Sequence, residues 1–381
     1  MSDTRPPGRN EASDTPENPS NAEAERPKIG LNLALEGGGV KGIALVGAIQ
    51  ALEEELEKNK DYILGSAEAR MVGTSAGAVV STLFAAGYTS SELTKIIGGP
   101  EIARFANGSR FGRVPVLGSL EKLSGLLLHL GMYKGDYFTD YIRELLREKK
   151  KTTFRDFIDP RNGGDQQNRY RLRLVASDIT RGRMLILPDD VDSYRYGVDP
   201  DDLDVALAVR MSISVPFVFR PVRRTGRNGV TSIIVDGGLL SNFPIRLFDR
   251  PRPGSHEATI GIRILSDRMH DIRFPLIALR AAYALVSTAQ EAHDISDTEE
   301  AMDVLKWFRV VQINTEKISP LKFELSPLQK EMLYDAGYRT MRHQIRYFLE
   351  QVRDAQQAAE QAEGLARTVE RRVRIRTRGP L

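Results

Sequence analysis

Two glycine-rich turns, each preceded by an apolar strand pattern and followed by a helical pattern, constrain the fold of this chain most strongly. The first pattern runs from Ile29 to Leu35 and passes through Gly37-Gly38-Gly39 into a helix. The second runs from Ala69 to Val72 and passes through Gly73-Thr74-Ser75-Ala76-Gly77 into a helix that Gly87 can end. This alternation predicts an α/β fold with a mainly parallel sheet covered by helices, and it places functional chemistry at the carboxyl ends of the strands.

Ser75 stands between Gly73 and Gly77 at the second turn. A side chain at either glycine would collide with the backbone of a sharp strand-to-helix turn, so the spacing suits a turn that holds the serine out at its tip. The positive end of the following helix favours the negative charge of an acyl-transfer transition state. Because Gly, Ser and Ala are also common in ordinary tight turns, the pentapeptide indicates a nucleophile only together with an oxyanion site and a base.

The first turn, Gly37-Gly38-Gly39-Val40-Lys41-Gly42, admits three interpretations. It can be an ordinary strand-to-helix turn, and its spacing also matches a dinucleotide-binding fingerprint. The acidic residue that a dinucleotide site needs after the next strand is missing, because that strand leads directly into the Ser75 turn. As an oxyanion hole, the loop would direct the N–H groups of Gly38 and Gly39 at one oxygen. Lys41 then either adds positive charge near a phosphate or faces water.

A general base is the third requirement, and Asp236 is the best candidate. It ends the buried strand pattern Ser232 to Val235 and precedes Gly237-Gly238, a turn that would present its carboxylate at the tip of a strand. A partly buried carboxylate within hydrogen-bond reach of Ser75 can accept the hydroxyl proton. Asp-Gly-Gly is also an ordinary turn, and none of the five histidines stands in a context that marks it as a catalytic base.

Taken together, these three motifs resemble the patatin-like phospholipase family in composition and in order. The stretches Ala176 to Thr180, Met211 to Phe217 and Asn242-Phe243-Pro244 are similar to the family as well. The resemblance covers about residues 29 to 350 and implies a three-layer α/β/α fold with a Ser–Asp dyad. In that dyad Ser75 would form the acyl-enzyme and Asp236 would be the proton acceptor.

The same resemblance assigns Gly37, Gly38 and Gly39 to the oxyanion loop, with Lys41 at its basic position. The implied mechanism requires no metal and no cofactor. The sequence departs from the family pattern at two places, since position 36 is Glu where Asp or a small residue is frequent, and position 41 is Lys where many members carry Arg. Neither departure touches Ser75 or Asp236, so both concern the substrate rather than the reaction.

Composition narrows the functional class further. Among 381 residues, 54 basic and 51 acidic side chains give a net charge of +3, which offers no reason to expect nucleic acid as the main partner. The chain has no cysteine, so it has no disulfide, thiol nucleophile or cysteine-ligated metal, as suits a reducing compartment. No apolar run approaches the ~20 residues of a membrane span, and the polar N-terminus does not resemble a signal peptide. We therefore expect a cytoplasmic protein.

Composition also divides the chain into three parts. Residues 1–28 contain five prolines and little to bury, which predicts a disordered tail; residues 29–350 form the catalytic domain. Residues 351–381 predict a helical extension and a basic tail. That tail is either solvated or in contact with anionic lipid, and the apolar segment 114–133 either packs on the sheet or forms an acyl channel or lid. A cluster of arginines either contacts anionic headgroups or lies on a solvated hairpin; its members are Arg220, Arg223, Arg224 and Arg227. The sequence does not indicate an oligomeric state.

The sequence thus predicts a lipid acyl hydrolase of the phospholipase A or lysophospholipase type that uses a Ser75–Asp236 dyad. The main alternative is an α/β-hydrolase-type esterase with a Ser–Asp–His triad that uses His256 or His293. A third hypothesis is a binding module that keeps the fold without turnover. Replacing each histidine tests the triad, and a covalent serine probe tests the silent module.

Overall fold

The computed structural model describes residues 28–64, 70–102, 131–160, 164–165, 168–248, 257–265, 310–315, 318, 322 and 324–377. The expected N-terminal tail, most of the apolar segment 114–133 and the last four residues of the basic tail lie outside these ranges. So do His129, His256, His270 and His293. The expectations for these segments therefore stay predictions.

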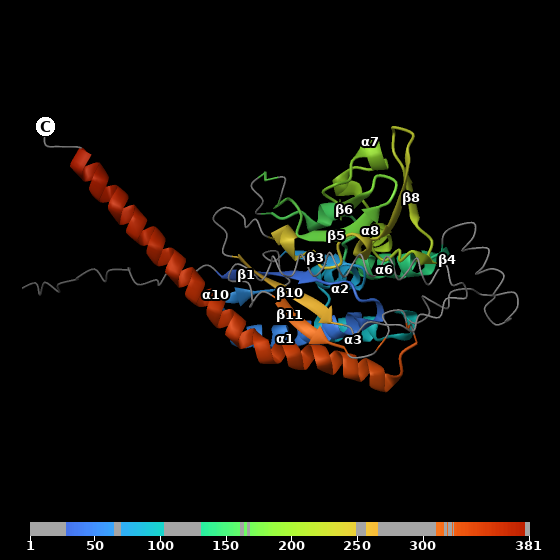
Figure 1. Ribbon diagram of the computed structural model, residues 1–381, viewed down its shortest axis with the longest axis horizontal. Coiled ribbons are helices and arrows are strands. Elements are labelled where there is room, and N and C mark those ends of the chain that lie inside the picture. Colours follow the sequence, from blue (N-terminus) through green and yellow to red (C-terminus); the bar gives the residue numbers. More distant parts are fainter. Residues whose placement is uncertain are drawn as a thin grey trace, which may run out of the picture.

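A nine-stranded sheet forms the centre of the described fold (Figure 1). Its strands are β1 (Ile29–Leu35), β2 (Tyr62–Ile63), β3 (Met71–Thr74), β5 (Leu172–Asp178), β6 (Arg183–Leu187), β8 (Val222–Thr225), β9 (Thr231–Asp236), β10 (Glu257–Leu265) and β11 (Val310–Asn314). The order is β11-β10-β1-β3-β5-β9-β8, with β2 beside β1 and β6 beside β5. All pairs from β11 to β5 are parallel, whereas β9 runs antiparallel to β5 and to β8. The expected mainly parallel sheet is confirmed.

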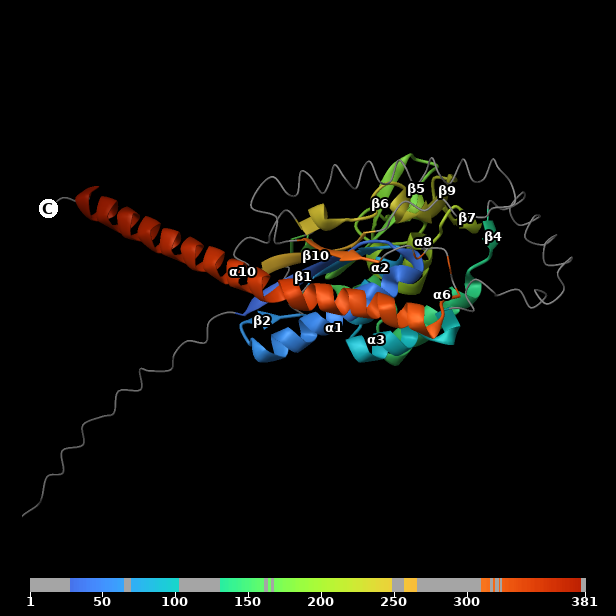
Figure 2. The same ribbon diagram turned by 60° about the horizontal axis from the view of Figure 1, so that its bottom comes forward.

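The described helices and the small second sheet surround this core. The helices are α1 (Gly42–Lys58), α2 (Ala76–Ala85), α3 (Ser90–Ile97), α6 (Asp136–Glu148), α7 (Ser193–Tyr196), α8 (Val205–Ser212) and α10 (Pro327–Thr377). Short 3₁₀ helices are η1 (Gly39–Lys41), η2 (Phe154–Phe157), η4 (Pro200–Asp202), η5 (Gly237–Leu239) and η6 (Ile245–Phe248), and β4 (Gly131–Tyr133) pairs with β7 (Phe217–Phe219). Figures 1 and 2 show α1, α3 and α10 together on one side of β1 and β10.

The side chains of each central strand alternate between two apolar layers, as the two-residue repeat of a strand requires. Leu33 and Leu35 of β1 join the larger cluster with α1, α2 and α8, whereas Ala34 joins a smaller cluster on the opposite face. In the described residues, Phe243, Ile245 and Phe248 cover that second face. Both faces of the sheet are therefore buried, which explains why the parallel strands read as continuous apolar runs.

Helix α10 packs along α1 before it extends beyond the body of the molecule (Figure 1). Ser326 caps its start, because the Ser326 hydroxyl accepts the Gln329 N–H at 3.2 Å and the Gln329 side chain accepts the Ser326 N–H at 3.1 Å. Tyr338 Oη donates to Glu54 at 2.6 Å, and the Tyr62 hydroxyl donates to the Leu349 carbonyl at 2.6 Å. The helix crosses residue 350 without a break. Among the described residues, it and the other helices are too short or too polar to cross a bilayer.

The elements expected around the two glycine-rich turns agree with the structure, and the differences lie at their ends. The strand expected over Ala69 to Val72 instead covers Met71–Thr74, because its last residues pair with β5 up to Val175. We call the Ser75 turn between β3 and α2 the elbow, and α2 the elbow helix. Gly87, expected to end this helix, has a φ of +98°, and the Tyr88 N–H donates to the Leu83 carbonyl at 3.1 Å. This left-handed glycine closes α2 in the predicted way.

Candidate active site

Ser75 forms the whole turn between β3 and α2. Its backbone angles are φ 52° and ψ −118°, a left-handed conformation that non-glycine residues rarely adopt and that marks strained functional turns. A Cβ added to Gly73 would lie 2.3 Å from the Gly77 carbonyl oxygen, and one added to Gly77 would lie 2.3 Å from the Leu35 carbonyl oxygen. Both glycines are thus required by the close approach that the sequence indicates.

Strand register brings Asp236 to this turn. Thr74 at the end of β3 pairs with Val175, and Asp236 at the end of β9 pairs with the next residue of β5, Ala176. Because β9 runs against β5, the carboxyl ends of β3 and β9 meet near the middle of β5. The side chains of Ser75 and Asp236 interact there, although 161 positions of sequence numbering separate them.

The Asp236 carboxyl is buried, and its environment changes its proton affinity. Burial raises the pKa of Asp236 to about 7, and the neighbouring Ser75 hydroxyl together with the hydrogen bond from the Gly238 N–H limits this rise. Oδ1 accepts the Gly238 N–H at 2.8 Å, whereas Oδ2 has no aligned hydrogen-bond donor among the described residues. A carboxyl with a pKa near neutrality can take and return a proton near physiological pH.

The glycine loop between β1 and α1 lies beside Ser75. The Gly37 N–H donates to the Asn242 carbonyl at 3.1 Å, while the N–H groups of Gly38 and Gly39 have no acceptor among the described residues. Gly39 has a φ of +55°, which glycine adopts readily and which turns the loop into η1. The loop therefore offers two backbone donors rather than three. The Lys41 side chain is only 1 % exposed, so the interpretation that it faces water is wrong.

A buried carboxylate holds the start of the loop. Glu36 accepts from Arg263 Nε at 3.2 Å, from the Asn242 side chain at 3.4 Å and from the Ile264 N–H. The Asn242 side chain also donates to the Gly37 carbonyl at 3.3 Å. These bonds tie the loop to β10 and to the segment after Asp236. Glu36 thus anchors the glycine loop, a role that the sequence of the loop does not indicate.

Ser212 is a further residue of the site to which sequence analysis gave no role. Its hydroxyl accepts the Ser75 N–H at 3.0 Å and donates to the Val175 carbonyl at 2.6 Å. It therefore fixes the strained backbone of Ser75 to β5. The segment Met211 to Phe217 carries part of the family resemblance, which is a signal for importance, but the contact itself joins residues 137 positions apart.

An apolar pocket opens next to Ser75 and contains about 600 Å³ of empty space, including its mouth. Its walls come from the glycine loop, the elbow helix, the end of α3, α6 and the segment from α8 to β7. The described lining residues are Gly39, Val40, Gly42, Ser75, Ala76, Val79, Val80, Ile97, Ile102, Phe138, Ile213, Val215 and Phe219. Apart from the Ser75 hydroxyl, these side chains are hydrocarbon, so the pocket suits an apolar ligand.

This combination of elbow, glycine loop and buried aspartate agrees with a comparison against protein-family models. The model described as patatin-like phospholipase matches residues 33–249, which is more than half of the chain. The chain belongs to the patatin-like phospholipase family. The patatin-like α/β fold expected from the sequence is therefore confirmed, and the matched range includes Ser75, Asp236 and the glycine loop.

Three related proteins match more than half of this chain. The uncharacterized protein YqhO of Bacillus subtilis is 36 % identical over 307 residues, covering 80 % of this chain and 94 % of that protein. The uncharacterized protein R571 of Acanthamoeba polyphaga mimivirus is 28 % identical, covering 82 % and 93 %. A protein of Invertebrate iridescent virus 6 named "probable lipid hydrolase 463L" is 23 % identical, covering 58 % and 63 %.

Solved structures give a weaker likeness. VipD from Legionella pneumophila is 17 % identical with a TM-score of 0.45, and the match covers 84 % of this chain and 67 % of VipD. The type III effector ExoU is 15 % identical with a TM-score of 0.42, covering 84 % and 53 %.

Proposed function

We propose that this protein hydrolyses carboxylic esters of phospholipids or lysophospholipids through a Ser75–Asp236 dyad and an acyl-enzyme. Asp236 accepts the Ser75 proton as Oγ attacks the ester carbonyl. The N–H groups of Gly38 and Gly39 hold the oxygen that becomes negative, and each such donor is typically worth about 10²–10³ in rate. The protonated Asp236 then returns its proton to the leaving alcohol, and the same carboxylate activates the water that releases the fatty acid.

The observation that carries this proposal is the buried Asp236 carboxyl, with a pKa raised to about 7, interacting with a serine at a strained strand-to-helix turn. A buried aspartate with a purely structural role is usually stabilised by a paired cation, whereas the neighbour of Asp236 is the Ser75 hydroxyl. Oδ2 of Asp236 lacks an aligned donor among the described residues, which leaves it available to the Ser75 proton. Perturbed groups of this kind cluster at active sites.

The apolar pocket supports a fatty acyl ester as the substrate. Its wall begins at Ser75 and is built from hydrocarbon side chains such as Val79, Ile97 and Phe138. Each methylene of an acyl chain buried there contributes about 0.8 kcal/mol, so a long chain binds far better than an acetyl group. The name "probable lipid hydrolase" of the viral relative agrees with this substrate class. A peripheral membrane contact and a cytoplasmic location belong to the same proposal.

Fatty-acid release from mixed anionic phospholipid vesicles, without added metal, tests the proposal. We expect release by the wild-type protein and a loss of at least about 10³-fold for Ser75→Ala and for Asp236→Asn. Leu328→Ser, a change at an exposed position of α10, is the control and should retain full activity. Full activity of Asp236→Asn would refute the dyad, and silence of the wild type on both vesicles and short-chain esters would refute hydrolysis.

Replacing the histidines distinguishes the Ser–Asp–His triad from the Ser75–Asp236 dyad. His343, the histidine within the described residues, is exposed on α10 and is absent from the pocket lining. The dyad predicts that His256→Ala and His293→Ala retain activity. A covalent fluorophosphonate probe that fails to label Ser75 would favour the silent binding module.

A further inference from the structure

The hairpin of β8 and β9 projects past the edge of the sheet on which the candidate active site lies. Asp236 pairs with Ala176, and Ile234 already pairs with Asp178, the last residue of β5. The preceding residues of β9 and the turn 226–230 therefore extend beyond the carboxyl edge of the parallel strands. At about 3.3 Å per residue, the turn lies ~20 Å from Asp236 along β9.

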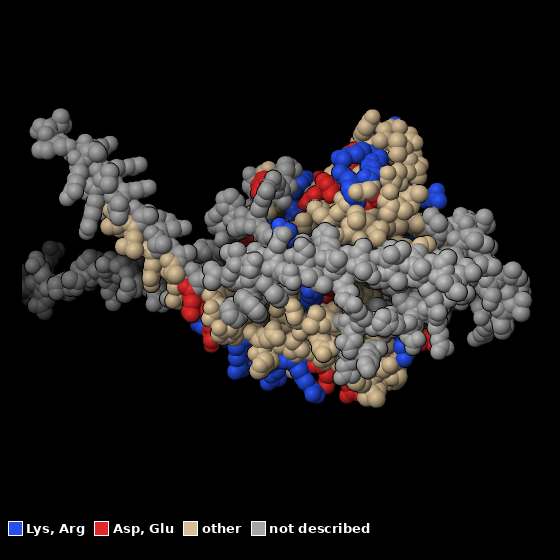
Figure 3. Space-filling view, in the orientation of Figure 1, with Lys and Arg blue, Asp and Glu red and all other residues tan. Residues whose placement is uncertain are grey.

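The projection carries exposed apolar and basic side chains in its turn, on α7 beside the turn and on β8. Tyr194 on α7 is 65 % exposed and Val230 in the turn is 43 % exposed. Arg227 in the turn and Arg223 on β8, where it pairs with Ile233, are exposed, and among the described residues they form no ion pair. We call these four residues the hairpin tip. Figure 3 shows Lys and Arg side chains next to Asp and Glu side chains on this projecting part, with uncharged side chains over most of its end.

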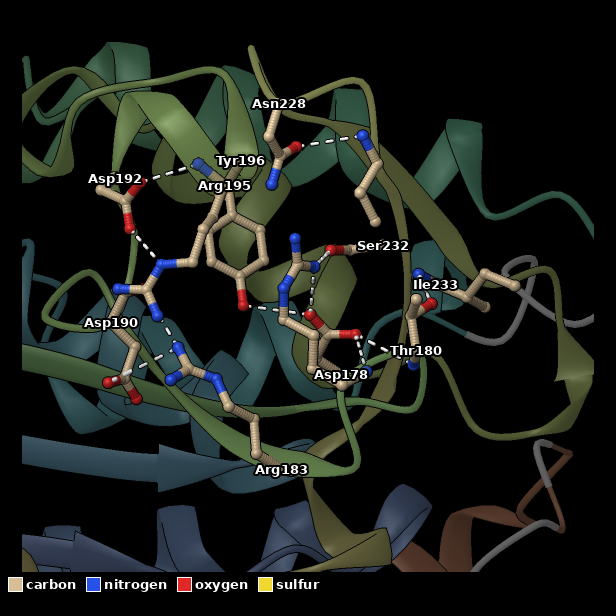
Figure 4. Close-up of polar contacts among 12 residues, drawn as sticks. Asp178, Thr180, Arg183, Asp190, Asp192, Arg195, Tyr196, Asn228, Ser232 and Ile233 are labelled. Carbon is tan, nitrogen blue, oxygen red and sulfur yellow. Dashed lines mark hydrogen bonds and ion pairs between the residues drawn. The ribbon is translucent and has the colours of Figure 1, made fainter.

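Backbone contacts place α7 against the turn. The Asn228 N–H donates to the Tyr194 carbonyl at 3.2 Å, and Arg224 donates from two nitrogens to the Tyr196 carbonyl at 3.1 and 3.2 Å. The Tyr196 hydroxyl in turn donates to the buried Asp178 at 3.0 Å (Figure 4). The hairpin tip is thus braced on the end of β5, and its exposed side chains are presented by an ordered frame.

The local charge balance favours an anionic partner. Residues 217–235 contain four arginines and no acidic residue. The acids of the neighbouring loop are paired with other arginines. Asp189 pairs with Arg173. Asp190 lies 3.8 Å from Arg183, and Asp192 lies 2.5 Å from Arg195 (Figure 4). The positive charges of Arg223 and Arg227 are therefore available to bind an anionic partner outside the chain.

We propose that the hairpin tip docks this protein on an anionic phospholipid surface, with Tyr194 and Val230 entering the headgroup region and Arg223 and Arg227 contacting phosphates. Amphipathic aromatic side chains favour the membrane interface, and arginine suits phosphate geometry. The inference rests on the proposed lipid hydrolase function. The hairpin is also joined to the site at both ends, because β7 before it supplies the pocket residue Phe219 and its own second strand, β9, ends at Asp236.

Vesicle binding by the full-length Ser75→Ala variant tests this surface without turnover. Vesicles of phosphatidylcholine mixed with phosphatidylglycerol are compared with vesicles of phosphatidylcholine alone in a co-sedimentation assay. For the added change Arg223→Gln/Arg227→Gln we expect about fivefold weaker binding to the anionic vesicles for each arginine, or ~25-fold together. The added change Tyr194→Ser/Val230→Ser should weaken binding to anionic vesicles by about tenfold or more.

Matched controls remove the same groups elsewhere. Arg147→Gln/Arg339→Gln deletes two exposed arginines of α6 and α10, and Leu328→Ser deletes an exposed apolar side chain; both should bind as the parent does. Circular dichroism and the thermal midpoint establish that each variant folds. Raising the salt concentration to about 0.5 M should remove most of the arginine effect, because exposed charges are then screened.

Unchanged anionic-vesicle binding by the arginine variant, or an equal loss in the controls, would overturn the proposal. Binding to a DNA duplex that depends on the same arginines, without vesicle binding, would replace the lipid surface by nucleic acid. If the parent binds vesicles through the tip but the wild type releases no fatty acid, the docking surface stands and the proposed hydrolase function fails. The two ideas are therefore refuted by different results.

Discussion

Replacing Asp236 by Asn should raise the stability of the protein at alkaline pH while it abolishes activity. Burial raises the pKa of this carboxyl from 3.8 to about 7, so the charged form is disfavoured in the folded state by about 4 kcal/mol relative to the unfolded chain. Asparagine has nearly the same shape and no charge. We therefore expect Asp236→Asn to gain up to about 4 kcal/mol in the free energy of unfolding at about pH 9, less any loss in the Gly238 contact.

The sign of this effect depends on pH. The neutral carboxyl is favoured by the folded state, so its contribution is fully present below about pH 4 and is lost as pH rises through about 7. The gain of the asparagine variant should accordingly shrink as pH falls, to about 1.6 kcal/mol at about pH 5, and vanish below about pH 4. Urea unfolding of both proteins across this range measures it. Asp335→Asn, which changes a more exposed aspartate paired with Arg339, is the control.

Activity supplies the second half of the test. If Asp236 is the base, kcat/KM of the wild type for a short-chain ester should fall about tenfold for each pH unit below 7 and level off above about pH 8. An asparagine variant with the same stability difference at both ends of the pH range would refute the assignment of the raised pKa. A rate profile without an inflection near neutrality would refute the assignment of the base.

Three further predictions concern the frame of the site. Ser212→Ala removes the acceptor of the Ser75 N–H, so kcat should fall about 10–100-fold with little change in KM, and Ser212→Thr should restore part of the rate in steady-state assays. Ile97→Trp narrows the apolar pocket, so kcat/KM for long-chain esters should fall about 10–100-fold relative to short-chain esters in a chain-length series. Gly77→Ala puts a Cβ 2.3 Å from the Leu35 carbonyl oxygen and should lower the free energy of unfolding by at least about 1–3 kcal/mol in urea titrations.

The elbow and the glycine loop could be predicted from sequence because their constraints are local. Glycines two positions before and after Ser75 are required by contacts within one strand-to-helix turn, and the apolar runs of β1 and β3 report burial on both faces. The position of the glycine loop was predicted, but which of its N–H groups are free to bind an oxyanion was not. Its Gly37 N–H is bonded to Asn242, a residue more than 200 positions away, which no local pattern specifies.

The supporting residues escaped prediction for the same physical reason. Ser212 and Glu36 act through partners brought near by strand register and helix packing, and a lone buried Ser or Glu has no characteristic spacing in sequence. Lys41 is the opposite case: a lysine in a glycine-rich loop is expected to be exposed, but the folded chain buries its side chain. Long-range geometry, rather than residue type, decides these cases.

The antiparallel direction of β9 links the proposed chemistry to the proposed docking surface. A strand parallel to β5 would carry its carboxyl end to the same edge as Asp178, and its amino end would point back into the body. Because β9 runs the other way, its last residue reaches Ser75 while its first residues project outward as the hairpin. One strand thus joins the candidate base to the exposed tip, so a change in the register of β9 would disturb catalysis and docking together, whereas changes confined to the tip should disturb docking alone.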